Sequence, residues 1–311
     1  MAEARVGVVG ATGAVGRVVV DLLAERGFRD VRLFASARSA GTEIAGRAVE
    51  QATPEALAAG ELDLCLFSVG ARASRDLVPH AVRGGAVCVD KSSAFRLDDG
   101  VPLVVPEVNG ERALEHDGLL ANPNCCAIPL TLVLKPLHDA AGLRAVRVAT
   151  YQSASGAGAQ RVQRLLEEPQ AEHDLAMDWD YDGEEFEEES KLREETRKIL
   201  ELPDLPLSAT CVRVPVPVGH AESVWVETEE PLAPEHAREL LAAAPSVRLE
   251  EFPTPGLAAG GDEALVGRIR RDPAAENGLS LFIACDNLRK GAALNGIQIA
   301  QLVLSQRALA A

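Results

Sequence analysis

The chain has 311 residues, of which 47% are hydrophobic, 25% are charged and only 4% are aromatic, and its formal net charge is −16. This length suits one large domain or two smaller ones with a sizeable core. The acidic charge argues against broad contact with nucleic acid or with an acidic membrane surface. A site for an anionic substrate would therefore have to be locally basic.

The six cysteines give no sign of a zinc site. They form no CxxC pair, and no cysteine–histidine cluster has zinc spacing. Cys65, Cys88 and Cys285 lie in apolar runs, where we expect buried reduced thiols. The N-terminus lacks the pattern of a signal peptide, and no apolar run reaches the roughly 18 residues of a membrane span. We therefore expect no metal and a cytoplasmic protein.

Short apolar strands alternate with helices in the first half of the chain. This alternation with short connections is typical of a parallel, doubly wound sheet in an α/β fold. The pattern predicts strands over 5–9, 31–35, 62–69, 86–89, 101–104 and 118–120, and helices over 15–26, 75–84 and 131–139.

The second half has a mixed pattern that indicates an α+β domain. Its last helix is long enough to pack back on the first domain. The dense acidic stretch from Asp174 to Glu195 is interpreted as a solvated loop and helix face. The pattern predicts strands over 146–152, 209–215, 223–228 and 279–284, and helices over 158–167, 187–200, 235–243 and 292–304.

A glycine-rich turn follows the first strand. Gly10, Gly13 and Gly16 are spaced GxxGxxG, which permits a tight turn and a close approach of the backbone to a phosphate. The spacing alone is weak evidence, because turns between strands and helices are often rich in glycine.

The end of the second strand carries Ser36, Arg38 and Ser39, where an NAD-selective enzyme tends to place an acidic residue. One cation and two hydroxyls suit a 2′-phosphate, although an ordinary polar loop would look the same. Together with the glycine turn, this segment indicates NADP.

Residues 121–128 read ANPNCCAI and place two thiols, Cys125 and Cys126, at the start of a helix. A helix N-terminus lowers the pKa of a thiol, and Asn122, Asn124 or backbone amides could hold an oxyanion. Either thiol could be the nucleophile on this argument, and two structural cysteines are the alternative. A thiolate and a dinucleotide loop in one chain suggest attack on an acyl group, followed by hydride transfer.

Further candidates carry charge. Arg213 and His220 lie seven residues apart in RVPVPVGH, where an arginine fork could bind a carboxylate and a histidine could shuttle a proton. By itself, His220 would more often be structural. Arg96 could grip a phosphate or lie on the surface. Glu188 and Lys191 share one helix face, where a surface ion pair is the simpler interpretation.

The chain resembles the aspartate-semialdehyde dehydrogenase family over essentially its whole length. The segments that carry this resemblance are, in order, GATGAVG, ASARSAG, SSAFR, VPEVN, NPNC, YQSASGAG, ESKLREETRKIL, TCVRVPVPVGH and DNLRKGAALNGIQIA. The combination of NPNC, SGAG and an arginine–histidine pair in that order is far more specific than a glycine loop.

The resemblance implies a fold, a reaction and an assembly. It implies a Rossmann-type NADP domain of residues 1–126 plus 294–311, and a catalytic and dimerisation domain of residues 127–293. The implied reaction is the reversible conversion of L-aspartyl 4-phosphate and NADPH into L-aspartate 4-semialdehyde, NADP and phosphate, in the biosynthesis of the aspartate-family amino acids. The implied assembly is a homodimer.

The resemblance also implies residue roles. The nucleophile is Cys125, which follows NPN, and His220 is the acid/base. Asn124 or backbone amides are the candidates for the oxyanion. The substrate ligands are Gln152, Glu188 and Arg213, and the phosphate ligands are Arg96 and Lys191. Cofactor contacts are expected at Gly10, Thr12, Gly13, Ala14, Val15, Ser36, Arg38, Ser39, Ser155, Gly156 and Asn287.

Some positions depart from the family pattern. Cys126 replaces the serine or valine expected after the nucleophile, and Lys91 stands where asparagine is common. The usual IAFN-type stretch reads LAMDW from Leu175 to Trp179 and is followed by a more acidic loop. This last change affects the expected interface of the second domain.

Three alternatives remain. An N-acetyl-glutamyl-phosphate reductase usually shows a PGCY-type cysteine segment, which is absent here. A malonyl-CoA reductase would not need a ligand for a substrate amine, so Glu188 argues against it. A non-catalytic relative would be expected to lose the cysteine or the histidine, and both are present.

Overall fold

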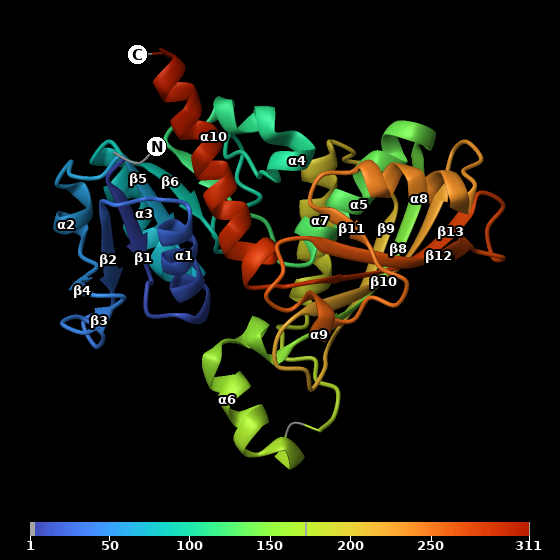
Figure 1. The fold of residues 1–311 in the computed structure, drawn as a ribbon, viewed down its shortest axis with the longest axis horizontal. Coiled ribbons are helices and arrows are strands. Elements are labelled where there is room, and N and C mark those ends of the chain that lie inside the picture. Colours follow the sequence, from blue (N-terminus) through green and yellow to red (C-terminus); the bar gives the residue numbers. More distant parts are fainter. Residues whose placement is uncertain (1–3, 172, 311) are drawn as a thin grey trace. The chain divides into compact units, whose positions relative to one another are not determined.

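The computed structural model describes residues 4–171 and 173–310, and it divides into two compact units (Figure 1). The first unit comprises residues 1–123 and 292–311, and the second comprises residues 124–291. The sequence predicted these boundaries at 126/127 and 293/294. No helix among the described residues is long and apolar enough to cross a membrane.

The first unit is built on a seven-stranded sheet of order β3-β4-β2-β1-β5-β6-β7. All neighbouring strands are parallel except β3 and β4, which confirms the predicted doubly wound α/β sheet. The strands are β1 (Val6–Val9), β2 (Val31–Ala35), β3 (Glu43–Ile44), β4 (Arg47–Gln51), β5 (Leu64–Phe67), β6 (Val87–Asp90) and β7 (Leu119–Ala121).

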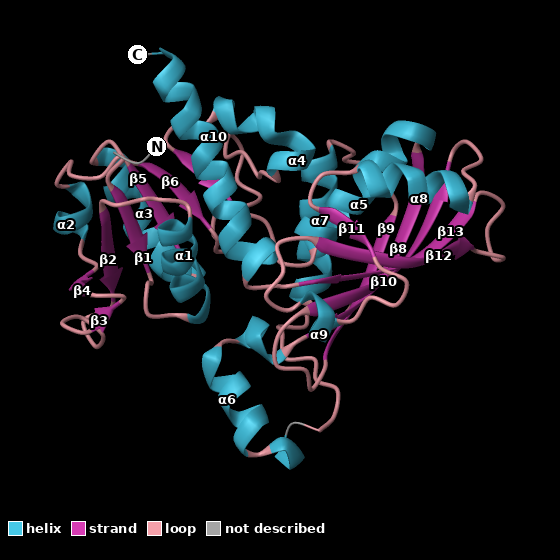
Figure 2. Ribbon diagram, in the orientation of Figure 1, coloured by secondary structure: helices cyan, strands magenta, loops and turns pink. Residues whose placement is uncertain are grey.

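Helices cover both faces of this sheet (Figure 2). One apolar cluster joins α1 and α10 to the sheet through residues such as Leu23, Val8 and Ile297. The other joins α2 and α3 through Leu57 and Val78. The helices are α1 (Ala14–Glu25), α2 (Pro54–Ala58), α3 (Ala71–Arg83), α4 (Pro106–Asn109) and α10 (Leu294–Ala310). The strand predicted over 101–104 is reduced to a single bridge, between Leu103 and Ala121.

The second unit is built on a six-stranded mixed sheet of order β11-β12-β13-β10-β8-β9. Its strands are β8 (Leu143–Gln152), β9 (Leu207–Arg213), β10 (His220–Thr228), β11 (Val247–Leu249), β12 (Ala264–Arg271) and β13 (Gly278–Cys285). Its helices are α5 (Ala127–Ala141), α6 (Ala159–Glu167), α7 (Glu187–Leu200), α8 (Pro234–Ala243) and α9 (Pro255–Ala258). The predicted bounds of α7 are confirmed, whereas β11 and β12 were not predicted.

Helices α5, α7 and α8 contact one face of this sheet. Residues on β8 and β10 alternate between this buried face and a more exposed one, as expected for a sheet that is covered on one side. Val148 and Val224 point into the core, whereas Arg147 and Trp225 lie on the more exposed face.

The acidic stretch from Asp174 to Glu195 is only partly solvated. Glu188, Glu189 and Glu195 on α7 are buried, so the prediction of a solvated helix face is wrong for these three. Each accepts hydrogen bonds from amide groups that would otherwise be buried without partners. For example, Glu189 accepts bonds from the backbone amides of Phe186 and Cys211.

Candidate active site

Strand register places three of the sequence-predicted residues at one end of the second sheet. Gln152 on β8 pairs with Arg213 on β9. The pairing of Ala221 with Tyr151 brings His220, the first residue of β10, to the same end. All three side chains lie on the buried face. Gln152 and Arg213, which are 61 positions apart in the sequence, therefore become neighbours on adjacent strands.

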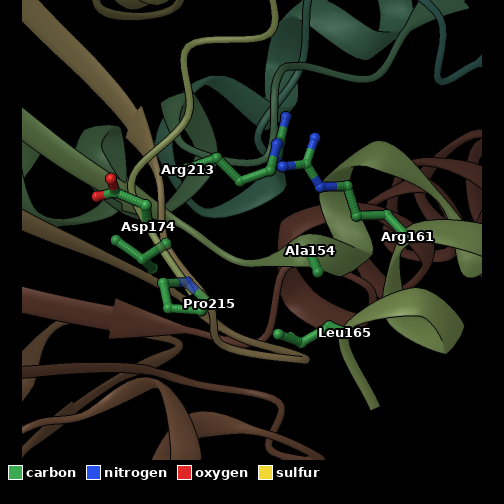
Figure 3. Close-up of a pocket in the computed structure, with 7 residues that line it drawn as sticks. Ala154, Arg161, Leu165, Asp174, Arg213 and Pro215 are labelled. Carbon is green, nitrogen blue, oxygen red and sulfur yellow. The ribbon is translucent and has the colours of Figure 1, made fainter. Parts of the chain in front are cut away.

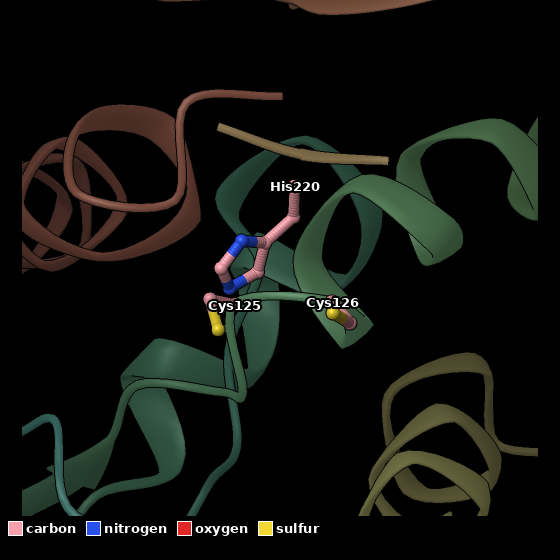
Figure 4. A group of neighbouring side chains, drawn as sticks. All are labelled: Cys125, Cys126 and His220. Carbon is pink, nitrogen blue, oxygen red and sulfur yellow. The ribbon is translucent and has the colours of Figure 1, made fainter. Parts of the chain in front are cut away.

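The two thiols lie against this row of residues. The Sγ atoms of Cys125 and Cys126 and a ring nitrogen of His220 all lie within 4.8 Å of one another (Figure 4). Cys125 is partly exposed, whereas Cys126 is fully buried. A hydrogen bond with Cys125 and burial raise the pKa of the Cys126 thiol well above its usual range. The geometry therefore favours Cys125 as the thiol that can form a reactive thiolate.

The contacts of His220 determine which ring nitrogen carries the proton. Its Nδ1 accepts a hydrogen bond from the backbone amide of Ser153 at 3.0 Å. Because an amide can only donate, the neutral ring must carry its proton on Nε2. Nε2 is buried and has no hydrogen-bond partner among the described residues, so its proton is available to a substrate.

Asn124 connects the start of α5 to α7. Its Oδ1 accepts a hydrogen bond from the Cys126 amide at 2.8 Å, and its Nδ2 donates to Glu188 at 2.9 Å. Its own backbone amide donates to Glu195 at 2.6 Å. Gln152 donates to the same oxygen of Glu188 at 3.1 Å. These bonds bring Asn124, Gln152 and Glu188 together beside Cys125.

Arg213 is almost completely buried. Its Nη1 donates to the carbonyl oxygen of Ser153 at 2.9 Å, and its Nε lies 2.9 Å from both carboxylate oxygens of Asp178. Nη1 and the Nε2 atom of His220 both lie against Gly156, where an added Cβ would come within 3.1–3.2 Å of them. A larger residue at position 156 would therefore have to displace the arginine or the histidine by a few tenths of an ångström.

The loop after β8 is held by Asn287. Its Oδ1 accepts hydrogen bonds from the Gly219 amide and from the hydroxyls of Ser153 and Ser155, at 2.9 to 3.1 Å. Its Nδ2 donates to the Ser155 hydroxyl at 2.9 Å. The predicted cofactor residues Ser155, Gly156 and Asn287 therefore belong to one hydrogen-bonded loop region.

The other predicted cofactor residues lie in the first unit, around the turn after β1. Gly10 has a positive φ of 90°, and an added Cβ would lie 2.4 Å from the Ser68 carbonyl oxygen. A Cβ on Gly16 would lie 2.1 Å from the carbonyl oxygen of Gly10. The turn therefore requires glycine at both positions. Gly13 is the N-cap residue of helix α1, so the helix has no side-chain cap, and its first turn has no acidic residue.

The end of β2 lies beside this turn. The backbone amides of Gly10 and Ala11 donate to the carbonyl oxygen of Phe34 at 2.8 and 3.1 Å. Arg38 follows shortly after in the chain and is exposed, and it makes no ion pair within residues 4–171 and 173–310. The uncapped amides of α1 and this cation fit the phosphates of a dinucleotide.

The two predicted phosphate ligands belong to different units. Arg96 is buried in the first unit, where it donates to the carbonyl oxygens of Asn122 and Lys91 at 3.0 and 2.6 Å. Lys191, in the second unit, pairs with Glu187. Arg96 is therefore not the surface arginine considered as an alternative, and the phosphate site remains a prediction.

Sequence reasoning missed several residues that the structure places here. Ser153, Asp178, Glu195 and Glu222 contact the predicted residues or lie beside them. Ser153 and Glu222 lie within two residues of predicted ones and could have been suspected. Asp178 and Glu195 come from the acidic stretch, in which the sequence alone does not distinguish buried carboxylates from exposed ones.

Two family models match most of the chain. Residues 5–116 match the semialdehyde dehydrogenase NAD binding domain, and residues 134–290 match the semialdehyde dehydrogenase dimerisation domain. The aspartate-semialdehyde dehydrogenase of Streptomyces akiyoshiensis is 45% identical to the chain, covering 97% of it and 99% of the relative. That of Bacillus subtilis is 40% identical, covering 95% and 96%.

Solved structures agree with this match. Aspartate semialdehyde dehydrogenase II from Vibrio cholerae is 37% identical and has a TM-score of 0.92, covering 97% of this chain and 98% of that one. The chain belongs to the aspartate-semialdehyde dehydrogenase family. The resemblance seen in the sequence is thus confirmed, and membership makes the chain an oxidoreductase with a nicotinamide dinucleotide domain.

In this member of the aspartate-semialdehyde dehydrogenase family, a buried carboxyl group, that of Glu222, lies close to both Cys125 and Cys126. It stands two residues after His220 on the same buried face of β10, opposite Thr150 on β8. Neither carboxylate oxygen has a hydrogen-bond partner of normal geometry among the described residues. Burial, with a contribution from nearby Cys125, holds the pKa of Glu222 well above its usual range and favours its neutral form.

Glu222 should make this aspartate-semialdehyde dehydrogenase fold less stable as the pH rises. In the unfolded chain the carboxyl ionises above about pH 4.3, whereas the fold keeps it neutral, so stability falls with rising pH until the folded-state pKa is reached. Between pH 5 and pH 8, the melting temperature should therefore fall less in Glu222→Gln than in the wild type. The expected difference is a few degrees, since each kcal/mol of stability corresponds to ~2–4 °C. Scanning calorimetry at both pH values measures this difference.

Glu276→Gln is the control, since it removes a carboxyl group that is exposed to solvent in the folded protein. Equal pH dependence in the wild type and in Glu222→Gln would show that Glu222 is not held neutral by the fold.

Proposed function

We propose that the chain is an NADP-dependent aspartate-semialdehyde dehydrogenase that reversibly converts L-aspartyl 4-phosphate into L-aspartate 4-semialdehyde and phosphate through a thioester on Cys125. The observation that carries this proposal is the partly exposed Cys125 thiol within 4.8 Å of a ring nitrogen of His220. Two solved structures of the family support it. The Vibrio cholerae enzyme was solved in complex with ASA at 37% identity, and the Candida albicans enzyme with NADP at 25% identity and a TM-score of 0.78.

Two charged groups suit the ends of an amino-acid substrate. The Arg213 guanidinium is the cation nearest His220 in the hydrogen-bonded row, and its terminal nitrogens can bind the α-carboxylate. The Glu188 carboxylate already accepts bonds from Asn124 and Gln152, and it can accept a further one from the α-ammonium group. Holding both ends would fix the reacting carbon relative to Cys125.

The covalent step begins with the Cys125 thiolate. Its Sγ forms a bond to the acyl carbon, the carbon–oxygen bond to phosphate breaks, and phosphate leaves with both electrons of that bond. Asn124 or the first backbone amides of α5 would stabilise the oxyanion. Arg96 and Lys191 are proposed as the phosphate ligands on the basis of the family resemblance.

The next step reduces the thioester. A nicotinamide dinucleotide, when bound, supplies the hydride for this step. As the proposed acid/base, His220 donates a hydrogen bond from Nε2–H to the oxyanion of the resulting hemithioacetal on Cys125. When the hemithioacetal collapses, the electron pair of this oxygen forms the aldehyde carbonyl, the carbon–sulfur bond breaks, and the thiolate leaves with both electrons of that bond.

The phosphates of the cofactor would be held by the first unit. The amides at the start of α1, near Thr12, Gly13, Ala14 and Val15, suit the pyrophosphate. Ser36, Arg38 and Ser39 suit the 2′-phosphate of NADP. In the second unit, Asn287 makes its hydrogen bonds to Ser153, Ser155 and Gly219, so we infer that it maintains the shape of the loop that the family resemblance assigns to the nicotinamide.

The partner is a second copy of the chain. The more exposed face of the second sheet carries Arg147, Trp225 and Tyr151, and the ring of Tyr151 lies 6.2 Å from that of Phe282. This face belongs to the segment that matches the dimerisation domain model. Aromatic residues and arginine are enriched in interfaces, so we infer a homodimer through this face.

The assignment of the nucleophile is tested with two variants in one assay. Phosphate-dependent reduction of NADP with aspartate semialdehyde should be robust in the wild type and absent with malonate semialdehyde plus coenzyme A. Cys125→Ser should lose at least ~10³-fold in turnover, because an alkoxide forms far less readily than a thiolate. Cys126→Ala should keep most of the activity. The reverse pattern would exchange the roles of the two thiols, and activity only with coenzyme A would indicate a malonyl-CoA reductase.

Cofactor choice is tested at Arg38. Arg38→Ala should raise the KM for NADPH about ten- to a hundredfold, the equivalent of a lost charge-assisted bond of ~1.5–3 kcal/mol, and leave the KM for NADH nearly unchanged. Steady-state kinetics with both cofactors measure the ratio. Equal weakening of both would mean that Arg38 does not contact the 2′-phosphate.

The dimer is tested at Trp225. Trp225→Glu would bury an unpaired charge in the inferred interface, so we expect it to sediment as a monomer where the wild type sediments as a dimer. Leu114→Glu is the control, because it places the same charge on an exposed leucine of the first unit. A dimer that survives Trp225→Glu would place the interface elsewhere.

A further inference from the structure

Two arginines share one carboxylate beside the predicted substrate site. Arg161 on α6 donates from Nη1 to Asp178 at 2.6 Å, and Arg213 on β9 places Nε 2.9 Å from both Asp178 oxygens. Figure 3 shows the guanidinium groups of Arg161 and Arg213 pointing toward one another, in a pocket that Leu165 and Pro215 also line. Two cations this close would repel one another without the carboxylate.

The segment that carries Asp178 is held in place by backbone bonds. Ala176 and Arg213 exchange two backbone hydrogen bonds, of 3.0 and 2.8 Å. The Trp179 ring lies 4.8 Å from the guanidinium carbon of Arg213. This segment is LAMDW, the stretch that stands where the family resemblance leads us to expect an IAFN-type sequence. The backbone bonds on one side of Asp178 and the ring contact on the other keep the carboxylate beside Arg213.

The bonds of Arg213 divide its guanidinium into two parts. The Nε side is occupied by Asp178, whereas Nη1 lies against Gly156, next to Nε2 of His220. The end that faces the proposed reaction centre is thus the terminal one, and Asp178 lies on the other side of the group. A carboxylate bound only to Nε orients the terminal nitrogens without covering them.

The charge of Asp178 would by itself weaken the site. An anion bonded to Arg213 lowers its attraction for the carboxylate of a substrate. Arg161 offsets that anion, so the three groups together keep one positive charge. The side chains of Arg161 and Asp178 are 24% and 28% exposed, against 5% for Arg213, so solvent moderates this effect without removing it.

We propose that Arg161 and Asp178 are positioning residues for the substrate carboxylate: Asp178 orients Arg213 toward His220, and Arg161 neutralises Asp178 so that Arg213 keeps its affinity for an anion. This inference rests on the proposed role of Arg213 as the carboxylate ligand. On this proposal, Arg213 binds the carboxylate of the semialdehyde, whereas Arg161 and Asp178 contribute to its selection without touching the substrate.

The test is a double-mutant cycle on the full-length enzyme with aspartate semialdehyde, phosphate and NADP. Arg161→Gln leaves Asp178 without its neutralising partner, so it should raise the KM for aspartate semialdehyde about three- to tenfold with kcat within about twofold. Asp178→Asn keeps an oxygen acceptor for Nε and removes the charge, so its KM should stay within about threefold of the wild type. In the double variant Arg161→Gln/Asp178→Asn the three positions again carry one positive charge, so its KM should return to within about threefold of the wild type.

Two further measurements and a control variant test whether the effect acts through the orientation of Arg213 and through the substrate carboxylate. Asp178→Ala should raise the KM about tenfold, because Arg213 loses its orienting acceptor. With 3-aminopropanal, which lacks the carboxylate, wild type and Arg161→Gln should have the same kcat/KM. Arg248→Gln is the matched control, since Arg248 also pairs with carboxylates but lies on β11, at the opposite edge of the same sheet.

Three results would overturn the proposal. A lower KM in Asp178→Ala would mean that Asp178 competes with the substrate for Arg213. A double variant with a KM as high as that of Arg161→Gln alone would mean that Arg161 does not act by neutralising Asp178, and no effect of Arg161→Gln at all would remove Arg161 from the site. A wild type inactive with aspartate semialdehyde would instead defeat the proposed function. An unchanged KM in Arg213→Lys would defeat only the role of Arg213.

Discussion

The hydrogen bonds of Asn124 determine where the reactive thiol lies. Its side chain accepts from the first turn of α5 and donates to Glu188 on α7, while its backbone amide donates to Glu195 on the same helix. Cys125 is the next residue, so it can move little without breaking these bonds. Because Glu188 also accepts from Gln152, the start of α5, helix α7 and strand β8 form one connected polar network. A network with all its members satisfied is rigid in a low-dielectric interior.

Buried carboxylates in the second unit are stabilised in two different ways. Glu188 and Glu195 accept hydrogen bonds from amide donors, so their buried oxygens are satisfied. Glu222 has no such donor among the described residues, and burial raises its pKa. A hydrogen-bonded carboxyl group proposed to bind the substrate amine, on α7, and a carboxyl group held neutral near the thiols, on β10, therefore occur in the same unit. The first suits binding, and the second avoids placing a negative charge behind a thiolate.

The alternation of side chains along the second sheet assigns a separate role to each face. Gln152 and His220 lie on the face covered by helices, whereas Tyr151 and Trp225 lie on the face proposed for a second copy. A slip of one residue in the register of β8 and β10 would exchange the two sets. The proposed active site and the proposed dimer interface thus depend on the same pairing of β8 with β10. A variant that disturbs this pairing would change both.

The sequence by itself determined the fold class, the order of most elements and the identity of the family, because glycine turns, apolar periodicity and ordered motifs are local signals. It also drew attention to Cys125, Arg213 and His220, whose residue types suit the proposed chemistry. The tertiary structure decided which thiol is partly exposed, that Arg96 is buried, and that Asp178 bonds to both Arg161 and Arg213. These facts depend on contacts between residues far apart in the chain, and burial and partner choice at such contacts leave no periodic trace in the sequence.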